Sequence, residues 1–192
     1  WLKQAGGTRV PPMWGRFDSA AALVTLAAVV VWAAAPQSVL TGWLTLGAGV
    51  INAARLVRWR GSLAWREPLI WVLHLGYVWL AAGFLLLGLQ ALSPSLIATS
   101  ALHALTAGAM GTMVLAVMTR ASLGHPGRPL MSDRPTQLLF LALTIAVACR
   151  LAAPLLPQLY LPLLGAAGLA WAAAFGGFAA VYGPMLVSPR RA

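Results

Sequence analysis

The chain has 192 residues, of which 60% are hydrophobic and only 8% carry charged side chains. A soluble domain has charged side chains at about a quarter of its positions, so this composition excludes a soluble globular protein and indicates an integral membrane protein. The single cysteine, Cys149, excludes a disulfide framework and a thiolate metal cluster, and three acidic residues leave little for paired-carboxylate chemistry.

Six apolar segments are each close to the roughly 20 residues that a helix needs to cross a bilayer. They run near residues 19–35, 39–56, 68–89, 96–119, 135–153 and 159–186. Asp18 and Ser19 give a cap signal before the first segment, and Pro36 follows it. The sequence therefore predicts an all-α polytopic transmembrane bundle of six helices over residues 19–187, between a lead-in of residues 1–18 and a tail of residues 188–192.

The basic residues sort by segment. Twelve of the thirteen lie in segments on one side of the predicted bundle. These segments precede the first span (Lys3, Arg9, Arg16), join the second and third spans (Arg55, Arg58, Arg60, Arg66), join the fourth and fifth (Arg120, Arg128, Arg134), or follow the sixth (Arg190, Arg191). The positive-inside rule makes these segments, and both termini, cytoplasmic. The net charge of +10 is thus a topology signal that meets anionic lipid rather than nucleic acid.

The thirteenth basic residue, Arg150, lies inside the fifth span, near its outer end. Two interpretations stay open for it. Its guanidinium snorkels to the membrane surface, or it pairs with an anionic group inside the membrane.

Two histidines lie within predicted spans. His103 is in the fourth span, with Met110 near the same face and Met113 further round. An unpaired imidazole in hydrocarbon is costly, so His103 either bonds a neighbouring helix or ligates haem or a metal ion. The thioethers either fill packing gaps or ligate copper(I) or haem iron. His74, in the third span, either shares one steeply tilted haem with His103 or belongs to a separate site.

Small residues flank His103. Ala104 and Gly108, and Ala107 and Gly111, form small-xxx-small pairs that let a helix or a flat macrocycle approach closely. In the second span, Asn52 is a candidate for an interhelical hydrogen bond. No phosphate-binding loop, zinc-protease motif or nucleophile elbow is present, so no catalytic residues are assigned.

The segment from His103 to Leu130, HALTAGAMGTMVLAVMTRASLGHPGRPL, resembles the most characteristic stretch of the NnrS family. The matching positions are His103, Gly108, Gly111–Met113, Met118–Arg120, Gly124–His125 and Gly127–Pro129. Pro126 departs from the threonine more often found there. The flanking helices fit in hydropathy and order.

The resemblance implies a bacterial inner-membrane protein that contains haem, of b type, and copper and is associated with nitric oxide. It also implies that His103 is a ligand, and that Arg120, His125 and Arg128 have functional roles. Arg150 comes from the next helix at a similar depth, so it could then pair with a haem propionate. Family members have about twice as many spans. Since the chain starts without Met or a signal peptide, we expect it to be the C-terminal half, partnered by an N-terminal half.

Three functions follow as hypotheses. The first is a haem- and copper-binding membrane protein that responds to or protects against nitric oxide. The second is a haem-copper oxidoreductase acting on nitric oxide or quinol, which needs a proton path. The third is half of a secondary transporter, because paired six-helix repeats are common in that class.

Overall fold

The computed structural model describes residues 14–61, 67–93, 100–124 and 129–187, and every structural statement below concerns these residues. Their helices are α1 (Arg16–Ala34), α2 (Val39–Arg58), α3 (Pro68–Leu92), α4 (Ser100–His103), η2 (Ala104–Met110), α5 (Gly111–Gly124), α6 (Arg134–Ala152), η3 (Ala153–Leu155), η4 (Pro157–Leu159) and α7 (Tyr160–Val187). Because α4, η2 and α5 form one continuous span, Ser100–Gly124, the described residues contain six helices long and apolar enough to cross a membrane. The predicted all-α fold with six spans is confirmed.

The helix ends follow from local side-chain chemistry. The Ser38 hydroxyl accepts the Thr41 backbone N–H at 3.1 Å and caps α2. Asp133 caps α6 in the same way through Thr136, and Pro68 opens α3, where a missing N–H costs nothing.

The cap predicted before the first span is corrected by the structure. Gly15 is the capping residue, and Asp18 lies inside the first turn of α1. Its carboxylate accepts the Gly15 backbone N–H at 3.1 Å, three residues back along the chain. The carboxylate still satisfies a free N–H group at the start of the helix, but from within the helix rather than from the position before it.

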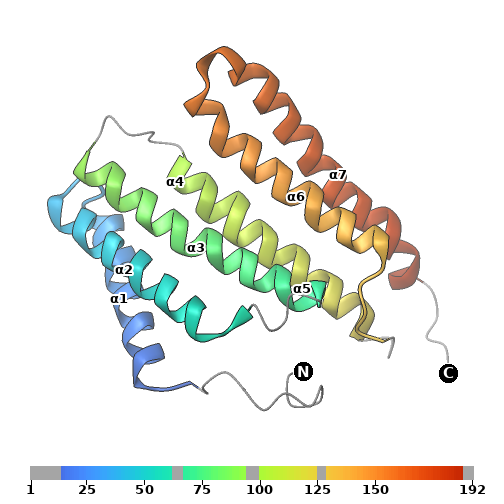
Figure 1. Cartoon of the computed structure of the whole chain (residues 1–192), viewed down its shortest axis with the longest axis horizontal. Coiled ribbons are helices and arrows are strands. Elements are labelled where there is room, and N and C mark those ends of the chain that lie inside the picture. Colours follow the sequence, from blue (N-terminus) through green and yellow to red (C-terminus); the bar gives the residue numbers. More distant parts are fainter. Residues whose placement is uncertain (1–13, 62–66, 94–99, 125–128, 188–192) are drawn as a thin grey trace.

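The helices form three groups (Figure 1). Helices α1, α2 and α3 pack side by side, the α4–α5 span lies against α3, and the α6–α7 hairpin packs on the other side of that span. The main core joins α3, α5, α6 and α7 around buried side chains such as Leu115, Leu143 and Tyr182. A smaller core joins α1, α2 and α3 around Ala28, Ala48 and Phe84.

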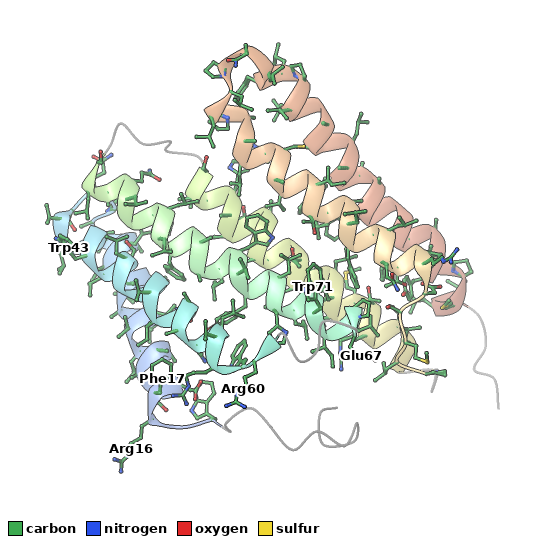
Figure 2. All side chains as sticks on the ribbon, viewed as in Figure 1. Arg16, Phe17, Trp43, Arg60, Glu67 and Trp71 are labelled. Atoms are coloured by element: carbon green, nitrogen blue, oxygen red, sulfur yellow. The ribbon has the colours of Figure 1, made fainter. Side chains whose placement is uncertain are left out.

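The surface of the bundle is apolar along its length and charged at one end. Large side chains such as Leu23, Trp43 and Val57 are more than half exposed, as expected where lipid replaces water. Figure 2 shows Arg16 and Arg60 at one end of the α1–α2 hairpin and Trp43 at the other. This separation agrees with the charge pattern of the sequence.

A buried polar network ties the first three helices together. Arg55 Nε donates to Asp18 Oδ1 at 2.8 Å, which joins α2 to α1. Arg55 Nη1 donates to the Tyr77 hydroxyl at 3.0 Å, and that hydroxyl donates to Asn52 Oδ1. The Asn52 amide in turn donates to Thr25 Oγ1 at 2.7 Å. Asn52 is therefore the interhelical hydrogen-bonding residue that the sequence predicted.

Arg55, which the sequence placed between the second and third spans, belongs to this network from within a helix. It lies within α2, and its guanidinium carbon sits 4.8 Å from the Trp14 ring centre and 4.9 Å from that of Trp59. A cation between two aromatic faces, with a carboxylate partner, is compensated for its loss of water. Arg55 thus holds helices together as well as adding positive charge to this end of the bundle.

Candidate functional site

The candidate site is a cleft of about 530 Å³ beside the π-helical segment η2. The helix containing His103 widens into a π turn directly after this residue, over Ala104–Met110. π segments are rare and are frequently found at functional sites. No pattern in the sequence had indicated this change of helix type.

Three side chains with ligand chemistry line this cleft. His103 and Met110 come from the α4–η2 segment, and Arg150 comes from the last turn of α6. Thr106 also lines it, but its hydroxyl already donates to the Leu102 carbonyl at 2.7 Å. The structure therefore brings an imidazole, a thioether and a guanidinium from two spans into one hollow.

The remaining walls are apolar and contain aromatic and small residues. Trp171 and Phe175 of α7 lie against each other with ring centres 4.8 Å apart, and both line the cleft. Ala107, Gly111 and Gly168 are small and leave room between the helices. The cleft opens on the outer surface of the bundle, where Met110 is 61% exposed.

Arg150 is the charged group in this apolar setting. It is half-buried, and among the described residues no hydrogen bond or ion pair reaches its guanidinium. A guanidinium always carries its charge, and within a membrane such charges pair with an anionic group or reach water. Both interpretations of Arg150 from the sequence remain compatible with this position.

The two glycines predicted to permit close packing do so on different sides. A Cβ at Gly108 would lie 2.8 Å from Cγ of Trp79 in α3, and one at Gly111 would lie 2.8 Å from Cη2 of Trp171 in α7. Both positions are contacts between helices, as predicted. Gly111 lets Trp171 lie against the helix at the edge of the cleft.

His74 lies elsewhere. Its Nδ1 is 3.0 Å from the Ile70 carbonyl oxygen, and its ring lies edge-on to Trp59 at 6.2 Å. A Cβ at Gly61 would lie 2.4 Å from His74 Cδ2, so only glycine permits this approach. The structure therefore places His74 beside Gly61 and Trp59, and His74 is not among the residues that line the His103 cleft.

The other predicted site residues are also dispersed. Met113 packs on Gly76 of α3, with its Cγ 3.0 Å from where a Cβ would be. Arg120 Nη1 lies 3.4 Å from the Leu69 carbonyl oxygen, beside a separate groove. His125 and Arg128 lie outside the described residues. Within the described ranges, no three His, Cys, Asp or Glu side chains come together as a multidentate metal site requires.

Four aromatic side chains of α7 follow one another at steps of four, three and four, and they divide between two roles. Trp171 and Phe175 line the cleft, whereas Phe178 and Tyr182 are buried in the main core. The Tyr182 hydroxyl bonds to Thr136 Oγ1, which donates to Asp133 Oδ1 at 2.6 Å. These bonds lie at the start of α6, where the Thr136 backbone N–H also donates to Asp133. Because Thr136 donates to the Asp133 carboxylate through both its side chain and its backbone, the pKa of Asp133 lies below its ordinary value.

Fold and site together define a polytopic helical membrane protein with a lateral cleft in the size range of small-molecule sites, about 300–1,000 Å³. The chain matches the family model described as NnrS protein over residues 1–190, and it belongs to this family. No match was found among curated proteins or among solved structures.

Proposed function

We propose that this NnrS family member binds haem in the His103 cleft and takes part in the bacterial response or resistance to nitric oxide. Family membership supports the link with nitric oxide. The observation that carries the haem assignment is that His103, Met110 and Arg150 line one apolar cleft walled by Trp171 and Phe175.

The residues present fit a haem better than a bare divalent ion. Imidazole and thioether side chains hold haem iron in proteins, and the cleft offers His103 and Met110 as residues that would hold it. Its propionates are anionic, and Arg150 is a guanidinium suited to carboxylates. The macrocycle is flat and apolar, like the walls. When bound, haem iron would supply a coordination position for nitric oxide.

Copper(I) is the second candidate ligand of the same cleft. It favours soft ligands, and Met110 offers a thioether beside the His103 imidazole. A copper ion would make no use of Arg150 or of the aromatic wall. Metal analysis together with an absorption spectrum therefore separates the two assignments.

The test compares two histidines in the purified protein. His103→Ala should remove the haem absorption band while folded protein remains, and His74→Ala should keep it because His74 lies outside the cleft. Arg150→Leu should weaken haem retention. Arg150→Lys should retain more haem than Arg150→Leu, since a lysine still supplies a cation for the haem propionate. An unchanged spectrum in His103→Ala would refute the assignment, and copper without haem would favour the second candidate.

We further propose that the charged end of the bundle is cytoplasmic and that the protein is a multi-pass protein of the bacterial inner membrane. The support is the segregation of basic residues, with Arg16 and Arg60 at one end and Trp43 at the other (Figure 2). Reporter fusions after Arg60 and after Ser93 should report opposite sides of the membrane. The same side for both would contradict the topology.

A further inference from the structure

A second hollow lies near the other end of the α4–α5 span. This groove, of about 340 Å³, is lined by Val117, Arg120, Ala121, Gly124 and Leu130. Among the described residues that line it, Arg120 is the charged one, and the others are apolar or lack a side chain. The groove therefore combines one cation with surfaces suited to hydrocarbon.

The Arg120 guanidinium has capacity for an anionic partner. Its hydrogen bond to the Leu69 carbonyl is long, at 3.4 Å, and occupies one of its five N–H groups. Within the described ranges the ion pair present is the one between Arg55 and Asp18, so no carboxylate neutralises Arg120. Asp133, the nearest acid along the chain, is bonded to Thr136.

Beyond the groove, the same side of the span stays apolar as far as Val114 and Met110, which line the His103 cleft. Met110, Val114, Val117 and Ala121 recur at helical steps of four, three and four, so they share one face. Three of them are substantially exposed, at 61% for Met110, 42% for Val114 and 58% for Val117. From Met110 to Arg120 the helix rises about 15 Å, which is half of the roughly 30 Å hydrocarbon core.

We propose that this face of α5 binds one anionic phospholipid, whose phosphate contacts Arg120 and whose acyl chain lies along Val117 and Val114. The length of the apolar face equals one leaflet, and the cation stands at the end where the headgroup would be. Basic pockets between helices are known to bind anionic headgroups. Of the three acidic residues, Asp18 pairs with Arg55, Asp133 accepts from Thr136, and no ion pair within the described ranges joins Glu67 to Arg120. At its far end this face reaches Val114 and Met110, which also line the His103 cleft, so a bound lipid and a bound haem would be neighbours there. The test below needs no haem.

Native mass spectrometry of the purified chain tests the proposal, with phosphatidylglycerol and phosphatidylcholine of the same acyl length as probes. The wild type should retain one phosphatidylglycerol in preference to phosphatidylcholine. Arg120→Gln should weaken that binding about five- to tenfold, because one cation near a headgroup has an effect of this size. Arg120→Lys should keep most of it. Arg16→Gln is the matched control, since Arg16 is exposed at the charged end of α1 (Figure 2).

A second variant keeps the charge and fills the groove. Ala121→Phe should displace the acyl chain and weaken phosphatidylglycerol binding although Arg120 is intact, and circular dichroism should confirm that both variants are folded. Glycerol phosphate, which has the headgroup charge without the chain, should not compete. The proposal is overturned if both lipids bind equally, if Arg120→Gln and Ala121→Phe bind as the wild type does, or if cross-linking from Val117→Cys captures a second copy of the chain on this face.

Discussion

Replacing Gly111 with leucine tests whether the contact between α5 and α7 sets the shape of the cleft. A Cβ at this position would lie 2.8 Å from Cη2 and 3.1 Å from Cζ3 of Trp171. The Trp171 ring must then move, and it lines the cleft beside Phe175. Gly111→Leu should therefore lower both stability and cofactor retention.

The magnitude follows from two opposing terms. Leucine improves helix propensity over glycine by about 0.8–1 kcal/mol, whereas overpacking a contact costs about 1–3 kcal/mol. Gly165, also in a membrane helix, has nothing within 4 Å of an added Cβ. Gly165→Leu thus gains the first term without the second. The difference between the two variants isolates the overpacking cost, about 1–3 kcal/mol.

The assay is unfolding in a denaturing detergent, followed by circular dichroism, together with the haem absorption of each variant. Gly111→Leu should unfold at lower detergent concentration than Gly165→Leu. Adding Trp171→Ala to Gly111→Leu should recover part of the stability, because the ring that clashes is gone. Equal unfolding of the two leucine variants would refute the reasoning, since Trp171 would then place no constraint on Gly111.

Two further predictions concern hydrogen bonds that join or begin helices. Tyr77→Phe leaves the buried Asn52 Oδ1 without its donor and should lower the free energy of unfolding by about 1–2 kcal/mol. Tyr160→Phe, at a 39% exposed position, should change it little, and equal losses in the two variants would contradict the network. Asp133→Ala removes the cap of α6 and should cost about 1 kcal/mol at neutral pH. Because hydrogen bonds from Thr136 lower the pKa of Asp133, its ionised form stabilises the fold above the ordinary carboxyl pKa. That contribution is lost as pH falls through the lowered pKa, so the wild type and Asp133→Ala should converge in acid, and a gap that widened there would be evidence against the cap.

The sequence determined the spans, because the length of an apolar segment is a local property of the chain and decides whether a helix can cross the hydrocarbon core of a bilayer. The six apolar segments match the six helices to within a few residues wherever both ends are described. It also identified Asn52 and Gly111 as interhelical positions, since a polar amide and a missing side chain each limit what can lie opposite. The motif that opens at His103 pointed to the family.

Lateral arrangement was decided only by the tertiary structure. Hydropathy does not say which face of a helix meets which neighbour, because every face of a membrane helix is apolar. The sequence left open whether His74 joined His103, and the structure packs His74 on Gly61, away from the residues that line the His103 cleft. It gave no sign that Asp18 would pair with Arg55, since these residues are far apart in the chain and meet only across α1 and α2.

The cleft itself shows the same limit. Met110 and Arg150 come from different spans, and they meet His103 because α6 and α7 pack against the span that widens at η2. Helical spacing had already placed Met110 near the face of His103, and both line the cleft. Spacing within one helix could not show which side chains of α6 and α7 close the cleft around them. The residues of the site were visible in the sequence, but their convergence depended on how side chains of neighbouring helices fit together.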